Sequence, residues 1–220
     1  MTDRPLRAEL EALPSRLALL PIDERGYPVP WFVAWADGRP EFRAMDAAKW
    51  RRAVRDRLCW MCGAPLGKWL TFVIGPMCAV NRTTAEPPCH TECARYAARN
   101  CPFLTRPQMT RREDETFNPA LHAAQGPGIA ILRNPGVTLL WTTRMYRVFY
   151  DDRRKPLIEI GEASSVEWFA EGRAATRAEV DASIESGLPL LRDVADRDGL
   201  AALVELTARA AAVRELYPPL

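Results

Sequence analysis

Two short pairs of metal-binding side chains most constrain how this chain can fold. The first pair is Cys59-x2-Cys62, which Gly63 follows at once, and the second is His90-x2-Cys93. A glycine directly after a C-x2-C pair suits a tight turn, or knuckle, that points two sulfurs at one spot. An apolar run over residues 69–74, closed by a Gly-Pro pair, separates the two pairs and predicts a strand.

The second pair is expected at the start of a helix. Pro87 and Pro88 end any preceding strand and suit the opening of a helix, so His90 and Cys93 share a face in its first turn. A knuckle that supplies two sulfurs and a helix that supplies an imidazole and a third sulfur make a tetrahedral set of the type that binds Zn²⁺. We therefore expect one structural Zn²⁺, held by Cys59, Cys62, His90 and Cys93.

Three further cysteines leave the ligand set open. Cys89 lies one helical turn before Cys93 and could replace His90, and Cys78 and Cys101 are further candidates. Because free cysteines are commonly buried as small apolar side chains, we assign these three to the core.

Composition predicts a protein of the cytoplasm. The 220 residues are 48% hydrophobic, which is enough for one sizeable core or two small ones. The polar start lacks the apolar segment of a signal peptide, and no apolar stretch approaches the roughly 18 residues that suggest a membrane span. In a reducing compartment the cysteines are expected to be thiols and metal ligands. The formal net charge of +2 gives no strong signal for nucleic acid or membrane.

Arginines near the predicted metal site are candidates for contacting phosphate. Asp46 can cap a helix that runs to about Arg57, with an apolar stripe on one side and arginines on the other. Those arginines form either a phosphate-binding face or a solvated helix face. The partner is expected to be a macromolecule, either nucleic acid or protein. The candidate nucleic-acid-binding residues are Arg51, Arg52, Arg55, Arg82, Arg111 and Arg112.

The pattern of elements predicts an α+β fold in four parts. Residues 1–45 read as a short helix (4–13) and an antiparallel meander with strands at 17–22, 29–36 and 41–44, turning at Asp37-Gly38. Residues 46–107 form the zinc module, and 108–127, which include His122, form a linker. Residues 128–220 are expected to form a second antiparallel meander, with strands at 129–132, 137–143, 145–150 and 157–160, followed by a C-terminal helical segment.

The C-terminal helices are predicted from their capping signals. Ser164-x2-Glu167 and Thr176-x2-Glu179 both match the capping box. The first is expected to open a short helix that ends near Gly172, and the second a helix that ends at Gly187. Two more helices are expected to begin at positions 189 and 199.

The chain also shows two resemblances to known proteins. The order of knuckle, hairpin and ligand-bearing helix over residues 59 to about 101 resembles a treble-clef zinc finger. A wider resemblance links the chain to an uncharacterised set of bacterial and phage-borne proteins. It implies a phage or mobile-element setting and no particular activity. The stretches that carry it are Phe72–Arg82, Glu86–Cys93, Cys101–Leu104 and Glu171–Arg177.

Three enzyme classes fit the residues poorly. A nuclease of the His-metal finger type needs a histidine between knuckle and helix, and residues 63–88 contain neither histidine nor aspartate. A zinc deaminase would have the H-x-E and C-x2-C motifs in the opposite order and one open zinc position. A cysteine nucleophile would be left with only His122 as partner.

Two hypotheses of different class therefore stand. The first is a non-enzymatic, zinc-stabilised protein that binds a macromolecule. The alternative is a metal- or carboxylate-dependent enzyme with its site in the C-terminal half, where four acidic residues fall near predicted strand ends: Asp151, Asp152, Glu159 and Glu162.

Overall fold

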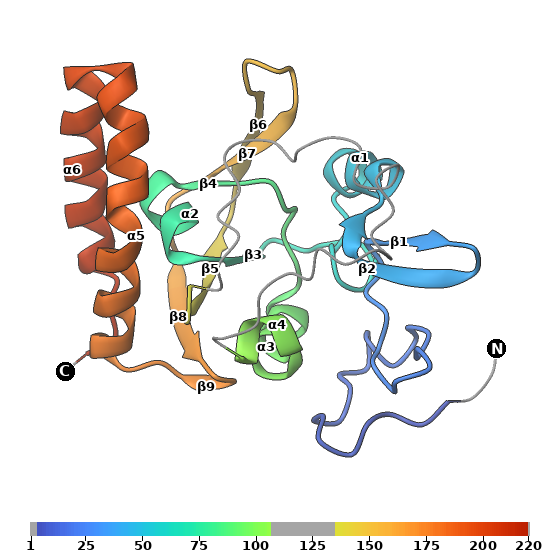
Figure 1. Ribbon diagram of the computed structural model, residues 1–220. Helices are drawn as coiled ribbons and strands as arrows, with labels where there is room; N and C mark the ends of the chain where they lie inside the picture. Colours follow the sequence, from blue (N-terminus) through green and yellow to red (C-terminus); the bar gives the residue numbers. More distant parts are fainter. Residues whose placement is uncertain (1–3, 107–134, 220) are drawn as a thin grey trace.

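The computed structural model describes residues 4–106 and 135–219, which form a mixed α/β arrangement with antiparallel sheets and a C-terminal helical hairpin (Figure 1). The α+β expectation is confirmed at this level. In chain order the elements are β1 (Val33–Ala36), β2 (Arg39–Met45), α1 (Ala47–Asp56), β3 (Leu70–Ile74), α2 (Pro76–Asn81), β4 (Thr83–Thr84), α3 (Thr91–Asn100), α4 (Pro102–Thr105), β5 (Thr138–Thr143), β6 (Tyr146–Tyr150), β7 (Pro156–Ile160), β8 (Ser165–Ala170), β9 (Arg173–Ala174), α5 (Arg177–Asp198) and α6 (Leu200–Arg214).

The N-terminal region is a hairpin preceded by turns. Strands β1 and β2 pair antiparallel, and both turn residues between them have positive φ, 49° at Asp37 and 74° at Gly38, as a type I′ turn requires. The helix predicted at 4–13 and the strand predicted at 17–22 are both absent, because the chain there runs through turns. Leu17 is nevertheless fully buried, so this stretch is held by packing.

Helix α1 begins where its cap was predicted. The Asp46 carboxylate accepts hydrogen bonds from the backbone N–H groups of Ala48 (2.8 Å) and Lys49 (3.0 Å). The helix ends at Arg57, which takes the left-handed conformation and directs the chain into the knuckle.

Two antiparallel sheets join strands from both sides of the undescribed stretch 107–134. One has the order β3-β5-β8-β9 and the other β4-β7-β6. Strands β3 and β4 therefore belong to different sheets and are not partners in a hairpin. The predicted second meander is also wrong in its order, since β5 pairs with β3 and β8 while β6 pairs with β7. The predicted strand at 129–132 lies outside the described residues.

The stretch opened by Ser164-x2-Glu167 is a strand, which corrects the helix predicted there. Residues Ser165–Ala170 form β8, and all but the last of them pair with β5. The segment contains a valine, a tryptophan and a phenylalanine, which suit a strand, and pairing with a buried neighbour outweighs the local capping signal. Its end is a hairpin turn at Glu171-Gly172, where both residues have positive φ.

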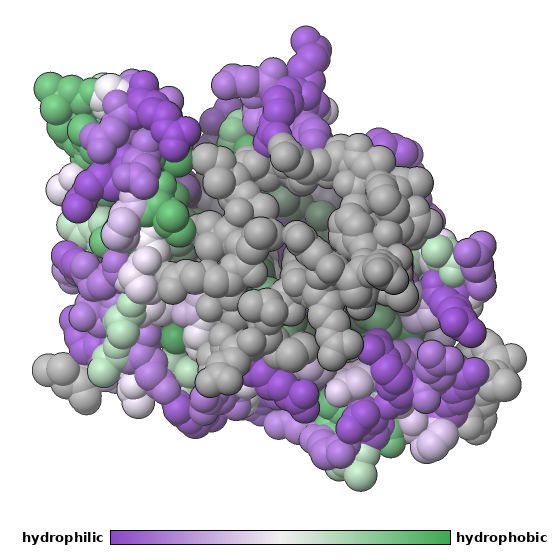
Figure 2. Space-filling model, viewed as in Figure 1, coloured by the Kyte–Doolittle hydropathy of each residue, from purple (hydrophilic) through white to green (hydrophobic). Residues whose placement is uncertain are grey.

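Helix α5 continues through the glycine and proline that were expected to divide it. Its capping box at Thr176 and Glu179 is present, but the helix runs to Asp198 with Pro189 inside. Gly187 lets α5 approach α2 closely, since a Cβ there would lie 2.6 Å from the Met77 sulfur of α2. Helix α6 follows after Gly199, and the two helices form a hairpin (Figure 1). Apolar surface is visible at the end of the hairpin where the two helices are joined (Figure 2). Near this turn Leu200 is 77% exposed and Val204 is 63% exposed.

Two buried clusters lie on either side of the β3-β5 pair. The larger joins β3, β5 and β7 to α2, α5 and α6, and the smaller surrounds the Cys and His pairs next to α3. Cys59 and Cys93 belong to this smaller cluster, together with Leu17, Trp60 and Tyr96. The metal-type residues are therefore part of a packed core, to which the turns before β1 contribute.

Candidate metal centre

The knuckle between Cys59 and Cys62 is shaped by short backbone hydrogen bonds. The N–H of Gly63 donates to the carbonyl of Cys59 (2.8 Å), and the N–H of Cys59 donates to the carbonyl of Ala64 (2.8 Å). Gly63 has φ +75°, and a Cβ there would lie 2.7 Å from the ring of Trp31. Both the conformation and the close ring therefore require glycine, so that the two sulfurs come to one side.

The second pair is brought to the knuckle by backbone contacts on each side of His90. Thr71 and Cys89 exchange two backbone hydrogen bonds (3.0 and 2.7 Å), and the N–H of Trp60 donates to the carbonyl of Pro88 (3.0 Å). His90 itself caps α3 without using its side chain, and its own N–H donates to the sulfur of Cys59 (3.4 Å). The imidazole is therefore free to face the three sulfurs.

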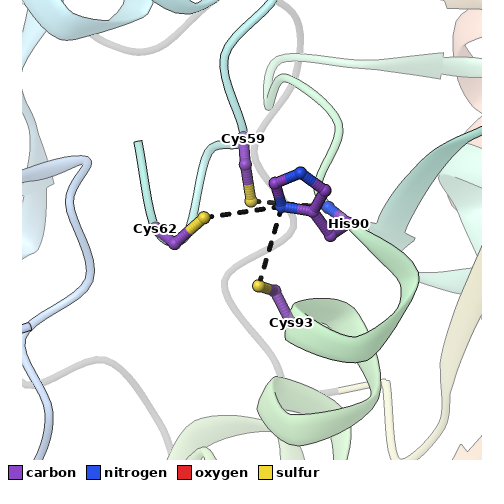
Figure 3. Close-up of side chains that lie close together, drawn as sticks. All are labelled: Cys59, Cys62, His90 and Cys93. Atoms are coloured by element: carbon purple, nitrogen blue, oxygen red, sulfur yellow. Dashed lines mark hydrogen bonds between the residues drawn. The ribbon is translucent and has the colours of Figure 1, made fainter. Parts of the chain in front are cut away.

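The four candidate side chains converge. Their ligand atoms all lie within 4.8 Å of one another, and this is the one such group of three or more Cys, His, Asp or Glu side chains in the part of the chain that the structure describes (Figure 3). Nδ1 of His90 lies 3.4 Å from the sulfur of Cys62 and 3.9 Å from that of Cys93. Sulfurs bound to one tetrahedral Zn²⁺ lie about 3.8 Å apart, so a small contraction would close the group around an ion.

The far side of the imidazole is also engaged. Nε2 of His90 lies 3.0 Å from the carbonyl oxygen of Pro65. A carbonyl only accepts, so Nε2 carries the proton and Nδ1 presents its lone pair to the sulfurs. Such an outer hydrogen bond orients a histidine ligand and fixes its tautomer.

The pKa values of the clustered thiols are shifted from their ordinary value. Hydrogen bonds from the thiols of Cys62, Cys89 and Cys93 hold the pKa of Cys59 well below its ordinary value. The ionised Cys59 in turn raises the pKa values of Cys62, Cys89 and Cys93. Without a cation the sulfurs therefore compete for a single negative charge, whereas a divalent ion would let the coordinating ones ionise together.

The other cysteines stand outside this group. Cys89 is buried against Cys59 but is not one of the four convergent ligands. Burial raises the pKa of Cys78 to about 11 and also raises that of Cys101, so both thiols stay protonated near neutral pH. This placement agrees with their assignment to packing.

The candidate arginines fall into three groups. Arg55 forms an ion pair with Asp56, and Arg82 forms one with Glu162 and also donates to the carbonyl of Ile160. Arg52 lies over the ring of Trp31, 5.6 Å from its centroid, and Arg51 is exposed on α1. Arg111 and Arg112, like His122, lie outside the described residues.

The four acidic residues of the alternative site do not form a convergent group. Asp151 accepts hydrogen bonds from the N–H groups of Arg153 and Lys155 within its own turn. Glu159 is paired with Arg147, and Glu162 with Arg82. None of the four, Asp152 included, takes part in the convergent group of Cys and His side chains.

One cluster was not predicted from the sequence. Trp69 is 44% exposed, and two cations, Lys68 and Arg144, approach its ring. The adjacent Lys68-Trp69 pair is visible in the sequence. Its meeting with Arg144 depends on the pairing of β3 with β5 and could not be read from either segment alone.

Comparisons with known proteins give no family. No family model, no curated protein and no solved structure matches the chain. Within the described ranges 4–106 and 135–219, no helix is both long and apolar enough to cross a membrane.

Proposed function

We propose that Cys59, Cys62, His90 and Cys93 hold one structural Zn²⁺ in a non-enzymatic protein that binds a macromolecule in the cytoplasm. The observation that carries the proposal is the convergence of four ligand atoms within 4.8 Å. Three sulfurs and one imidazole nitrogen fill all four positions of a tetrahedral zinc ion. A filled coordination sphere leaves no position for water or substrate, which is the arrangement of a structural site.

The position of the site supports a structural role. Its ligands come from two segments about thirty residues apart that pack in the smaller core cluster. An ion here would tie the knuckle to the start of α3. Because metal binding deprotonates the thiols, it would also couple metal affinity to folding.

The proposal keeps only part of the treble-clef assignment. A glycine-terminated knuckle is present, and so is a helix with one ligand at its cap and one in its first turn. Between them, however, the chain forms β3, α2 and β4 rather than a hairpin. We propose that the metal-binding half of a treble clef is retained while the intervening strands serve the two larger sheets. The phage or mobile-element setting rests on resemblance alone and stays a prediction.

The alternative, an enzyme with a carboxylate site in the C-terminal half, has less support. Asp151, Glu159 and Glu162 are each engaged in turns or ion pairs. Such pairs on the surface are common structural features of little energetic weight. We therefore favour the binding hypothesis.

Metal content and thermal unfolding of three cysteine variants test the structural role of the ion. Cys62→Ser and Cys93→Ser should lose zinc and unfold at lower temperature, and chelator should lower the parent's melting temperature toward theirs. Cys78→Ser is the matched control and should keep its zinc. If Cys62→Ser and Cys93→Ser melt like the parent, the ion does not support the fold and the proposal is wrong.

A further inference from the structure

The candidate for a partner-binding surface is an exposed tryptophan next to the metal centre. Trp69 is 44% exposed at the start of β3. Lys68 Nζ lies 5.3 Å from the centroid of its ring, and the guanidinium carbon of Arg144 lies 4.9 Å from it. Because Leu70 pairs with Thr143, Trp69 and Arg144 lie across from each other where β3 and β5 meet the surface.

The end of α1 lies beside the segment that leads to this pair. The carbonyl of Arg57 accepts a hydrogen bond from the N–H of Leu66 (2.8 Å), which holds the end of α1 against the segment leading to Lys68. We call Lys68, Trp69 and Arg144 the Trp69 patch.

The charges of this patch are not neutralised within the part of the chain that the structure describes. Lys68 and Arg144 form no ion pair with a carboxylate there, whereas neighbouring Arg55 and Arg147 are paired with Asp56 and Glu159. Two uncompensated positive charges around one exposed aromatic ring fit a partner that carries both negative charge and flat apolar faces.

Nucleic acid whose bases are unpaired has both properties. Every base can stack on an aromatic ring, and phosphates lie on both sides of it, while a duplex hides the base faces inside its stack. An acidic protein would match the charges but leave the ring without a specific partner. We propose that the Trp69 patch binds single-stranded nucleic acid, with a base stacked on Trp69 and phosphates contacting Lys68 and Arg144.

This inference rests on the proposed macromolecule-binding function, and it names single-stranded nucleic acid as the class of macromolecule that is bound. The patch also connects to the metal centre, because Pro65, whose carbonyl faces His90, lies three residues before Lys68. An ion that holds the knuckle would thereby fix the position of Lys68 and Trp69. The two claims remain separable, since patch variants leave every proposed zinc ligand in place.

The test is fluorescence polarisation of zinc-loaded protein with labelled oligothymidylate at low salt. The same duplexed sequence and an oligoglutamate peptide serve as competing probes. The variants are Trp69→Ala, Trp69→Phe and Arg144→Gln. Controls come from the β1–β2 hairpin: Trp35→Ala, at a residue that is 45% exposed, and Arg39→Gln, at a residue that is also exposed. Zinc content and melting temperature are measured for each variant.

Oligothymidylate should bind more tightly than the duplex, and Trp69→Ala should weaken its binding by about 5- to 150-fold. Trp69→Phe should recover part of the loss because it restores a ring. Arg144→Gln should lower the slope of log affinity against log salt by about 0.7. Both hairpin controls should bind like the parent, and all variants should keep their zinc.

Three results would overturn the inference. One is parental affinity of Trp69→Ala, and another is tighter binding of the duplex than of the single strand. The third is binding of oligoglutamate without binding of oligothymidylate, which would leave macromolecule binding in place with a protein as partner. Loss of zinc or a lowered melting temperature belongs instead to the metal proposal, which the cysteine variants test separately.

Discussion

The Nε2 atom of His90 lies 3.0 Å from the carbonyl oxygen of Pro65, on the side of the ring opposite the three sulfurs. This contact assigns the proton to Nε2 and leaves Nδ1 as the metal ligand. It also places the carbonyl of a residue just after the knuckle in the outer shell of the site, so that the two metal-binding segments support each other directly.

The tautomer gives the first prediction. In zinc-loaded protein, nitrogen NMR shifts of His90 should show a protonated Nε2 and a metal-bound Nδ1. His90→Cys should keep one zinc because it completes a four-sulfur site, while His90→Ala should weaken zinc binding. A metal-bound Nε2 would contradict this orientation of the ring.

Cys89 gives the second prediction. It is buried against Cys59 yet lies outside the convergent group, so Cys89→Ala should retain one zinc per chain. The variant should lose about 1 kcal/mol of stability or more, because truncating a buried side chain leaves a small cavity. Elemental analysis alongside Cys93→Ala checks this. If Cys89→Ala loses its zinc while His90→Ala retains it, the fourth ligand is Cys89 and not His90.

The third prediction concerns the turn between β8 and β9. Gly172 has φ +80°, and a Cβ there would lie 2.8 Å from the carbonyl oxygen of Arg99 in α3. Gly38 has a similar φ of +74° but open space around it. Gly38→Ala should cost about 1–2 kcal/mol from the left-handed conformation alone. Gly172→Ala should cost more in chemical denaturation, and equal costs would show that the turn does not pack on α3.

The capping box of α5 gives a fourth. Thr176→Ala should lower the free energy of unfolding by about 1 kcal/mol, since the Thr176 hydroxyl accepts from the N–H of Glu179 (3.3 Å). Arg173 and the backbone N–H of Thr176 lower the pKa of Glu179 to about 2 from its usual 4.5. A lowered folded-state pKa means that this carboxylate stabilises the fold above pH 4.5 and that the stabilisation is lost as pH falls toward 2.

The stability difference between the parent and Glu179→Gln should therefore be greatest above pH 4.5 and shrink below it. Denaturant unfolding across this pH range measures the difference. Any zinc released by acid affects both proteins alike and cancels. A difference that stays constant as pH falls would show that the carboxylate does not carry the capping interaction.

Local signals in the sequence predicted the parts of the fold that depend on neighbouring residues. The Asp46 cap, the Asp37-Gly38 turn, the knuckle at Gly63 and the Thr176 box all formed where they were expected. Each is decided within a few residues by backbone conformation and side-chain capping. The convergence of the two metal-type pairs also followed, because their spacing and order already pointed to one site.

Contacts between distant segments decided the rest. Ser165–Ala170 carries a helix-capping signal and is a strand because β5 lies beside it. Gly187 and Pro189 are usual helix-ending residues, yet α5 continues through both and packs on Met77 of α2. The Trp69 patch likewise exists only because β3 and β5, more than sixty residues apart, are paired. None of these outcomes is visible in the residues of one segment.

X-ray absorption at the zinc edge of the purified, unmodified protein tests the central claim most directly. A closed site of Cys59, Cys62, His90 and Cys93 predicts one zinc per chain, with three sulfurs at about 2.3 Å and one nitrogen at about 2.0 Å. An oxygen in the coordination shell would mean an open, catalytic-type position. Four sulfurs around the zinc would mean that another cysteine takes the place of His90. Absence of zinc would contradict the account altogether.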